Sequence, residues 1–517
     1  MEATLDSPSR RALARRAAEE GIVLLRNAKA MLPLRGLGSA IKTVAVIGPN
    51  ADNAHSTQGG YTNGNAHVVT VLAAVVEAAN ASGNAWRVVY ERGACLGATP
   101  LCACPIPAND TVPGCGITDT GRVSIAAAVA RAADVTILVL GDSSTILAGN
   151  GSGHHEEGTC GEHFDRDNLD PVGAQLPLLK AVAAASSKVI LTLIHGACFH
   201  FAAASFLPSF LLTLYDIMSL SNSRSLLPTL RVLLYSHSRC VAYTCAVPYC
   251  TPMHHIVAGR PMTFGANPSD GSNSIFEETV PATLAAWRPG EEGAFRLLFP
   301  LRSFLLSFLP SFLPYSLSFF NLGGHAIWSI INGSVNPSGR SAHTWPRTVG
   351  QIRQYTPWYK QWGTRHGAYA DASPATPLIP FGFGLSYTQY TLANLRLSHA
   401  NSTALPSDAP YTAAESVVIS IDVSSVGPAG RLVIQCYFQQ TLASRVRFEH
   451  MLLGWAKVDV AANATATTTT FALKIRDVEM WSEAERKYVV EASKYYISCG
   501  QHSQDLSLVR SIGVVES

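Results

Sequence analysis

The stretch from residue 134 to residue 194 constrains the fold more than any other part of this chain. Val135–Leu140 and Val189–Ile194 are continuous apolar runs, which are typical of parallel strands buried on both faces. Gln175–Ala185, which lies between them, has apolar residues at helical spacing. The order strand, loop, helix, strand predicts a βαβ unit.

The long loop that follows the first of these strands is rich in carboxylates. In open parallel sheets, ligands bind beyond the carboxyl ends of the strands. A group of carboxylates at that place therefore indicates acid/base chemistry. The charged residues concerned are Asp142, Glu156, Glu157, Glu162, Asp165 and Arg166.

The residues before this unit also alternate between helix and strand patterns. Residues 8–25 contain mainly strong helix formers and one apolar face, so we expect a single helix there. This alternation predicts an α/β domain with a mostly parallel sheet. The other expected elements are a strand at Thr43–Ile47, a helix at 69–80, a strand at Arg87–Tyr90 and a helix at 121–132.

The apolar pattern changes to a period of two after Tyr387. Short segments with alternating or β-branched residues are separated there by Gly, Pro, Asn and Asp. Strands at this spacing predict an all-β, immunoglobulin-like sandwich. The expected strands are Val417–Val423, Arg431–Phe438, Phe448–Val460, Ala464–Ile475 and Tyr488–Cys499.

In two stretches, residues 197–259 and 295–323, the apolar residues follow neither the helical period nor the two-residue period of a strand for long. Both contain the sequence Ser-Phe-Leu-Pro, and the flanking segments join sensibly when both stretches are left out. We therefore expect them to be foreign to the fold, for example translated intron sequence. The uncharged run Ser303–Phe320 is long enough to cross a membrane, but its two prolines and several serines argue against a membrane span.

Charge and cysteine usage limit the class of protein. The chain has 38 Lys and Arg against 36 Asp and Glu, so no nucleic-acid partner is expected. Adjacent residues at 154–157 (His-His-Glu-Glu) lack the helical spacing of a metal site, so no metal is expected. No other cofactor is expected. Four of the eleven cysteines lie close together in the sequence, which favours a small loop tied by disulfides. They are Cys95, Cys102, Cys104 and Cys115.

The cellular compartment is indicated by two opposing features. Cysteines in a loop and six Asn-x-Ser/Thr sequons favour a glycosylated, secreted protein. Residues 1–20, however, are polar and Arg-rich and contain no signal peptide. We expect the extracellular space or the secretory pathway. The sequons begin at Asn80, Asn109, Asn150, Asn332, Asn401 and Asn463.

Short motifs spread along most of the chain carry a resemblance to one enzyme family. They are Ala17–Asn27, Leu32–Leu34, Val44–Ala51, Asp165–Gln175, Trp287–Gly293, Asn336–Arg340, Thr344–Pro346, Pro380–Tyr387 and Leu453–Trp455. Each is weak alone, but their number and order are specific. The chain resembles the C-terminal part of a glycoside hydrolase family 3 enzyme, of the β-glucosidase and β-xylosidase group.

This resemblance implies three parts: a (β/α)8 barrel, an (α/β)6 sandwich and a fibronectin type III-like domain. The chain opens where the barrel should already have ended, and no position in it matches the family's nucleophilic aspartate. The expected segments are a linker helix at 1–37 after an absent barrel, an α/β sandwich at 38–349, a connector at 350–390 and a fibronectin type III-like sandwich at 391–512.

The resemblance also implies a general acid/base glutamate on a loop of the α/β sandwich, which corresponds here to residues 142–166. Glu162 is our first choice, because it stands three residues before Asp165-Arg166 as in similar sequences. Glu157 and Glu156 remain in reserve. The alternative is that Glu162 only pairs with Arg166. Asp165 and Arg166 themselves suit a structural pair, and His195 suits a core histidine.

The expected function is hydrolysis of O-glycosyl bonds by an exo-acting β-glycosidase that takes β-linked oligosaccharides or glycosides. Hydrolysis with retention of the anomeric configuration needs two carboxyl groups about 5–5.5 Å apart. Of these two groups, this chain is expected to offer only the acid/base. We therefore expect the isolated chain to be inactive unless a barrel is supplied. The alternatives are an inactive, barrel-less remnant that binds carbohydrate or protein, and a truncated gene product.

Overall fold

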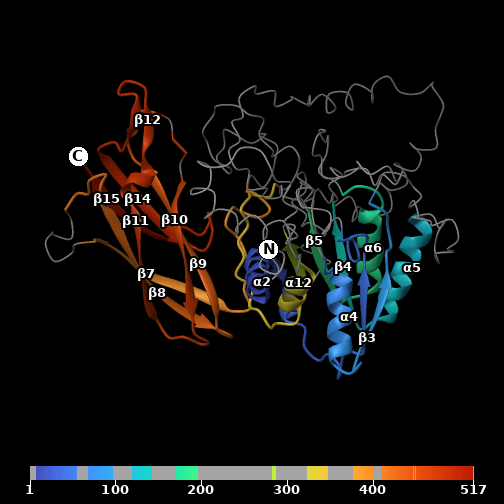
Figure 1. The fold of residues 1–517 in the computed structure, drawn as a ribbon. Coiled ribbons are helices and arrows are strands. Elements are labelled where there is room, and N and C mark those ends of the chain that lie inside the picture. Colours follow the sequence, from blue (N-terminus) through green and yellow to red (C-terminus); the bar gives the residue numbers. More distant parts are fainter. Residues whose placement is uncertain are drawn as a thin grey trace, which may run out of the picture.

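A computed structural model gives the fold of this chain as an α/β domain beside a β-sandwich (Figure 1). It describes residues 7–54, 68–96, 119–142, 171–195, 282–286, 323–346, 376–400, 409–445, 447–448 and 450–515. Of the two stretches expected to be foreign to the fold, 197–259 lies outside these residues, and 295–323 is described only at Gly323.

The α/β domain is built on a six-stranded sheet with the order β1-β6-β5-β4-β2-β3. Its neighbouring strands are parallel except for β1 and β6, which pair antiparallel, with Val23 opposite Ala285. This confirms the predicted, mostly parallel sheet. The strands are β1 (Val23–Asn27), β2 (Thr43–Ile47), β3 (Arg87–Glu91), β4 (Val135–Gly141), β5 (Val189–Ile194) and β6 (Ala282–Ala286).

Helices cover both faces of this sheet, because its central strands are apolar on both sides. Alternate residues of β4 enter different cores. Ile137 and Val139 pack with α2, α4 and α12, while Leu138 and Leu140 pack with α5 and α6. The helices are α2 (Pro8–Gly21), the short 3-10 helix η1 (Ala28–Ala30), α4 (Val71–Ala81), α5 (Asp119–Ala132), α6 (Gln175–Ala185) and α12 (Gly323–Ile331).

The single helix that we predicted over residues 8–25 is wrong at its end. Helix α2 ends at Gly21, and Val23–Asn27 form β1, so part of the expected linker is an edge strand of the sheet. Leu24 packs into one core, whereas Val23 and Leu25 pack into the other. This alternation has a period of two, so burial on both faces overrides the helical propensity of these residues.

The β-sandwich also follows the predicted class. Its two sheets have the orders β10-β9-β14-β15 and β11-β8-β7, and a separate hairpin joins β12 to β13. The strands are β7 (Gln389–His399), β8 (Ser416–Val426), β9 (Gly430–Gln440), β10 (Met451–Val460), β11 (Thr467–Lys474), β12 (Met480–Ser482), β13 (Lys487–Val489), β14 (Ser493–Gly500) and β15 (Leu508–Val514), with a 3-10 helix, η3 (Ile475–Val478), after β11.

The single strand predicted over Tyr488–Cys499 is divided into β13 and β14 in the structure. Glu491 lies at the break between them. Its carboxylate accepts hydrogen bonds from Gln440 Nε2 at 2.7 Å and from the Ser444 backbone at 3.2 Å. These bonds tie the segment between the two strands to the end of β9, so the chain leaves the hairpin before it enters the main sheet.

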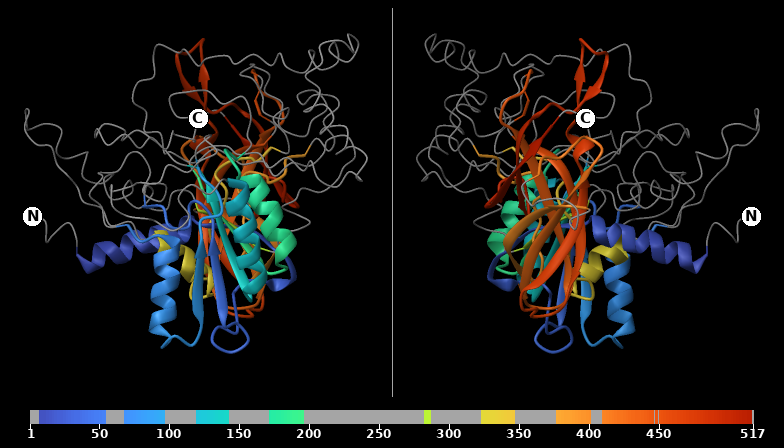
Figure 2. Two further views of the ribbon diagram at one scale, coloured as in Figure 1. Left: turned by 90° about the vertical axis from the view of Figure 1, so that its right-hand side faces the viewer. Right: turned by 90° about the vertical axis from the view of Figure 1, so that its left-hand side faces the viewer.

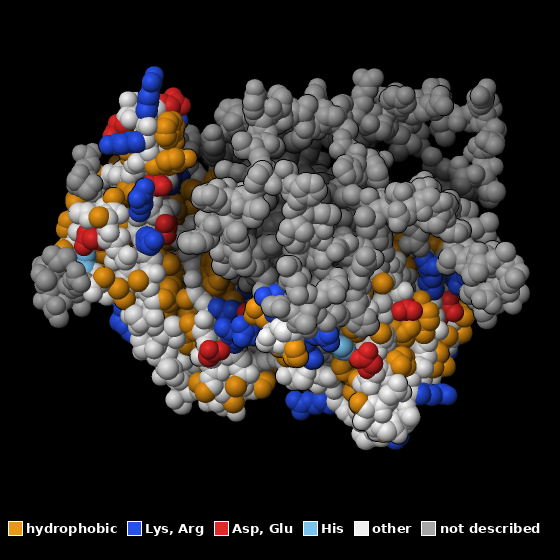
Figure 3. All heavy atoms as spheres, in the orientation of Figure 1, with side chains coloured by type: hydrophobic (Ala, Val, Ile, Leu, Met, Phe, Trp, Pro, Cys, Tyr) orange, Lys and Arg blue, Asp and Glu red, His pale blue; other side chains and the backbone are white. Residues whose placement is uncertain are grey.

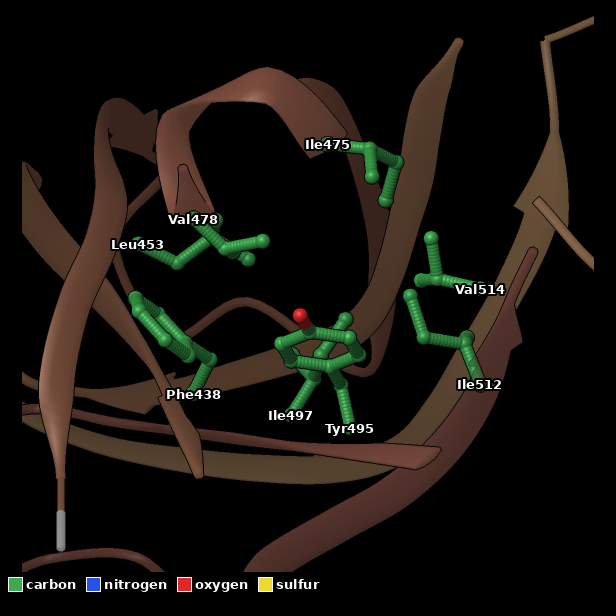
Figure 4. Close-up of a pocket in the computed structure, with 8 residues that line it drawn as sticks. All are labelled: Phe438, Leu453, Ile475, Val478, Tyr495, Ile497, Ile512 and Val514. Atoms are coloured by element: carbon green, nitrogen blue, oxygen red, sulfur yellow. The ribbon is translucent and has the colours of Figure 1, made fainter. Parts of the chain in front are cut away.

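The core of the β-sandwich contains a small gap between apolar side chains (Figure 4). The Tyr495 hydroxyl, the one polar atom drawn there, donates a hydrogen bond to the Glu491 carbonyl at 3.0 Å. The gap is therefore part of the packed core and offers no polar recognition to a ligand. Its lining is Phe438, Leu453, Ile475, Val478, Tyr495, Ile497, Ile512 and Val514.

A disulfide joins Cys436 of β9 to Cys499 of β14, which stand opposite each other in the register of the two strands. The sequence alone did not indicate this pair. Of the four loop cysteines expected to form disulfides, Cys95 is disulfide-bonded, and the other three lie outside the described residues.

Helix α2 bridges the two domains. Glu19 accepts a hydrogen bond from Ser329 of α12 at 2.8 Å. Glu20 pairs with Arg431 of β9 at 2.6 Å and with Lys457 of β10 at 2.9 Å. Figure 3 shows basic and acidic side chains next to each other in the region between the domains. Figure 2 shows that the N-terminal half of α2 projects from the rest of the α/β domain. Two adjacent glutamates thus tie one helix to both domains.

The charges of this bridge set the pKa of Glu20. Burial raises the pKa, but the hydrogen bond and charge of Lys457 and the charges of Arg431 and Arg16 outweigh it, so the pKa of Glu20 is lowered. Burial, together with the charges of Arg431 and Arg340, lowers the pKa of Lys457 by more than the hydrogen bond and charge of Glu20 raise it. The attraction to Glu20 thus only partly offsets the desolvation of the lysine.

Replacing both cysteines, Cys436→Ala with Cys499→Ala, should lower the free energy of unfolding of the β-sandwich by about 4 kcal/mol. The reason is that the bond closes a loop with a sequence separation of 63 residues. Urea unfolding followed by far-UV circular dichroism measures the change. Reductant should weaken the wild-type β-sandwich and leave that of the double variant unchanged. Equal urea midpoints for the two proteins would contradict the prediction.

Replacing Glu20 by Gln should lower the free energy of unfolding at pH 7 by about 1 kcal/mol, and by less in high salt. Because folding lowers the pKa of Glu20, its contribution is present above about pH 4.3 and is lost as the pH falls through the folded value. Urea midpoints at pH 7 and pH 3 measure both effects. The exposed carboxylate variant Asp477→Asn is the control, and a Glu20 effect that persists at pH 3 would argue against the ion pairs.

Candidate active site

Three polar residues meet where β2, β4 and β5 end at the carboxyl edge of the sheet. Asn50 follows β2, Asp142 follows β4 and His195 follows β5. All three are buried, and Asp142 is only 1% exposed. This edge of the sheet therefore gathers three polar side chains that are removed from water.

Asn50 fixes the ends of the two neighbouring strands. Its Nδ2 donates to the carbonyl oxygens of Asp142 at 3.1 Å and of Ile194 at 3.2 Å. The approach depends on a glycine, since a Cβ at Gly141 would lie 1.7 Å from the Ile194 carbonyl oxygen. The start of the loop after β4 therefore has a fixed position relative to β5.

Gln175, the first residue of α6, fixes both ends of the same loop. Its Oε1 accepts from the Gly141 backbone N–H at 2.9 Å, and its Nε2 donates to the Gly141 carbonyl at 2.9 Å and to the Val172 carbonyl at 3.1 Å. The side chain is fully buried. One amide group thus joins the point where the loop leaves the sheet to the point where it enters α6.

His195 lies in a packed aromatic environment. Its ring meets Trp345 edge-to-face, with 5.8 Å between ring centroids. The Trp345 indole N–H in turn donates to Ser341 Oγ at 2.9 Å, and Ser341 Oγ donates to the His343 carbonyl at 2.7 Å. Both rings are fully buried, so the segment around Trp345 packs against the carboxyl end of β5.

Asp142 is the one residue of the predicted charged cluster that the structure describes. Glu162, its reserves Glu157 and Glu156, and the Asp165-Arg166 pair lie outside the described residues. The structure therefore positions the residues at the two ends of this segment, and the acid/base role of its glutamates stays a prediction.

Sequence reasoning included Asn50, Gln175 and Trp345 only as members of the family motifs and gave none of them a role in the site. The available signal was their place: Asn50 follows a buried strand directly, and Gln175 begins the helix of the βαβ unit. Amides at such positions can bond the backbone where a strand ends.

No group of three His, Cys, Asp or Glu side chains suited to a metal occurs among the described residues. Within the same part of the chain, no helix has the length and apolar character needed to cross a membrane.

Other family motifs hold the two domains together. Asn336 Oδ1 accepts from Ser386 Oγ at 2.7 Å and from the Tyr387 backbone at 2.9 Å. Its Nδ2 donates to Thr388 Oγ1 at 2.9 Å and to the Ala429 carbonyl at 3.1 Å, close to the start of β9. This asparagine therefore joins the α/β domain to the connector and to the β-sandwich.

Gly339, Arg340 and Gly382 of these motifs lie in closely packed surroundings. A Cβ at Gly339 would lie 2.1 Å from the Ile22 carbonyl oxygen, and Gln435 of β9 donates to the Gly382 carbonyl at 2.9 Å. Burial lowers the pKa of Arg340 to about 10. Gln435 thus ties the connector to the β-sandwich, whereas Gly339 packs against the end of α2 within the α/β domain.

Gln175→Leu should leave the buried Gly141 N–H and carbonyl without their side-chain partner. We expect the free energy of unfolding to fall by about 2–4 kcal/mol and hydrogen exchange at the Gly141 amide to accelerate. Thermal unfolding and hydrogen-exchange mass spectrometry measure these effects. Gln504→Leu, at an exposed position, is the control. Unchanged protection of Gly141 would show that Gln175 does not anchor the loop.

Comparison with known proteins identifies both domains. Residues 22–215 match the glycosyl hydrolase family 3 C-terminal domain, and residues 432–503 match the fibronectin type III-like domain. A periplasmic β-glucosidase of Salmonella typhimurium is 23% identical over 529 residues, which cover 97% of this chain and 50% of that protein. A β-xylosidase of Formosa agariphila is 24% identical over 497 residues, which cover 94% of this chain and 48% of that protein.

Solved structures share the fold of this chain. A β-glucosidase from Erythrobacter marinus matches with a TM-score of 0.63 and 25% identity, covering 98% of this chain and 51% of that one. A β-D-glucoside glucohydrolase from Trichoderma reesei matches with a TM-score of 0.57 and 20% identity, covering 98% and 56%. The chain thus spans about half the length of these relatives. The resemblance inferred from the motifs is confirmed: the chain carries the C-terminal α/β domain of glycoside hydrolase family 3, followed by a fibronectin type III-like domain.

Proposed function

We propose that this chain supplies the acid/base domain of an exo-acting β-glycosidase of the β-glucosidase or β-xylosidase type. The observation that carries the proposal is the anchoring of one loop. Gln175 and Asn50 fix the point where residues 143–170 leave the carboxyl edge of the sheet, and Gln175 also fixes their return. This loop carries the three candidate glutamates. Relatives of twice the length are named β-glucosidase and β-xylosidase.

The proposed chemistry assigns one step to this chain. Glu162 donates a proton to the leaving oxygen of the glycoside and later removes a proton from the attacking water. Because the same group acts as acid and then as base, its pKa must lie near the working pH. A nucleophilic aspartate on a barrel domain attacks the anomeric carbon. No position of these 517 residues matches that aspartate, so hydrolysis requires a barrel in addition to them.

We further propose that the protein works outside the cytosol. Disulfides such as that between Cys436 and Cys499 form mainly in oxidising compartments and are rare in the cytosol. Asn80, the first sequon, is exposed at the end of α4 and so is accessible to a glycan. The Salmonella relative is named as periplasmic.

The test of the acid/base role uses this chain joined to a family 3 barrel. Glu162→Gln should lower kcat by roughly 10²–10⁴ for an aryl β-glycoside with a poor leaving group. A good leaving group departs without a proton, so the loss of kcat in the glycosylation step should be far smaller with 2,4-dinitrophenyl glycosides. Steady-state and burst kinetics with both substrates measure the difference.

Glu156→Gln and Glu157→Gln, which change the two reserve residues, should each keep nearly full activity, and a loss in Glu156→Gln instead of Glu162→Gln would move the role to Glu156. A loss that appears in Glu157→Gln instead would move the role to Glu157. If none of the three variants shows a loss that depends on the leaving group, the loop does not supply the acid/base.

A further inference from the structure

The hairpin formed by β12 and β13 presents two large aromatic side chains to solvent. Trp481 and Tyr488 stand opposite each other in its register, and their rings meet edge-to-face with 5.4 Å between centroids. Trp481 is 45% exposed and Tyr488 is 61% exposed. Figure 1 shows β12 at the end of the β-sandwich that lies away from β7 and β8, and Figure 2 shows the hairpin rising above the domain.

A structural role explains only part of this arrangement. A two-stranded hairpin is marginally stable, and a cross-strand aromatic pair contributes roughly 0.2–1 kcal/mol to it. However, one edge-to-face contact leaves about half of each side chain in water, where large apolar area is unfavourable. Two other aromatic residues of this domain, Phe448 and Trp455, are also exposed, and the hairpin adds to such exposure a contact between two rings at facing strand positions. The domain buries five more almost completely, namely Tyr390, Tyr411, Tyr437, Phe438 and Tyr495.

The charges around the pair are largely neutralised within the protein. Arg445 Nη2 lies 3.0 Å from Glu483 Oε1, and Lys487 Nζ lies 2.8 Å from Glu485 Oε2. These two ion pairs leave Arg486, at the turn of the hairpin, as the remaining charge of the segment. Electrostatic complementarity therefore favours a ligand without net charge, one that is recognised by the faces of the rings.

We propose that Trp481 and Tyr488 form an aromatic platform for a neutral β-linked glucan or xylan chain. In β-linked glucose and xylose the hydroxyls are equatorial, so the axial C–H groups form apolar faces. Such a face packs on an aromatic ring, whose quadrupole makes the face electron-rich and attracts C–H groups. The platform holds a distant part of the polymer and so raises the local concentration of chain ends. The choice of polysaccharide rests on the proposed function.

The test is binding of the 517-residue chain to soluble mixed-linkage β-glucan and to xylan, by affinity electrophoresis and calorimetry. Trp481→Ala and Tyr488→Ala should each weaken binding about tenfold, which corresponds to the loss of one well-stacked ring. Tyr488→Phe keeps the ring and should bind as the wild type does. Trp455→Ala is the matched control, because Trp455 is 59% exposed on β10, outside the hairpin.

Tryptophan fluorescence gives a second readout that does not depend on a destabilised hairpin variant. β-Glucan should change the emission of the wild type and of Trp455→Ala, whose remaining tryptophans include Trp481. The platform is overturned if the wild type fails to bind either polymer, or if Trp455→Ala weakens binding as much as Trp481→Ala does. It is also overturned if the wild type self-associates and Trp481→Ala abolishes this, which would make the pair a contact between copies.

The binding test is separate from the test of hydrolysis. Binding that depends on Trp481, in a protein whose barrel fusion hydrolyses no β-glycoside, would contradict the proposed function and leave the platform in place. Hydrolysis with unchanged polymer binding by Trp481→Ala would contradict the platform alone.

Discussion

The structure depends on the burial of β4 between two layers of helices. All seven residues of this strand are buried, and alternate side chains enter opposite cores. A strand with no exposed face cannot shift its register by one residue without exchanging both cores, so its position is strongly specified. The strands on either side, β2 and β5, are also buried throughout, and their pairing with β4 fixes their positions as well. The carboxyl edge of the sheet is therefore a rigid reference for the loop that follows β4.

Polar side chains then use this rigid edge to hold the chain at defined points. Two buried amides, Asn50 and Gln175, bond the backbone around Gly141 and the end of β5. The glutamates proposed as the acid/base lie between these anchored points, and proton transfer requires a group placed within hydrogen-bond reach of the substrate. The side chains that anchor the loop thus come from two separate segments, and neither of them is a carboxylate.

The family motifs outside this edge act mainly between domains. Glu19 and Glu20 on α2 bond different domains, and Asn336 bonds the connector and the turn before β9. Gly339 permits a backbone approach that any Cβ would block. Motifs that identify the enzyme family in the sequence are therefore largely structural here, and they set how the β-sandwich is placed against the α/β domain.

The sequence by itself determined the class of both domains, most strand and helix positions, and the family. The reason is that buried strands, amphipathic helices and two-residue alternation follow directly from local patterns. Only the tertiary structure decided that Val23–Asn27 form an edge strand, that Glu491 separates β13 from β14, and that Cys436 faces Cys499. It also assigned the loop anchors, since Asn50, Gly141 and Gln175 are up to 125 residues apart, and their contacts arise only when the parallel strands lie side by side.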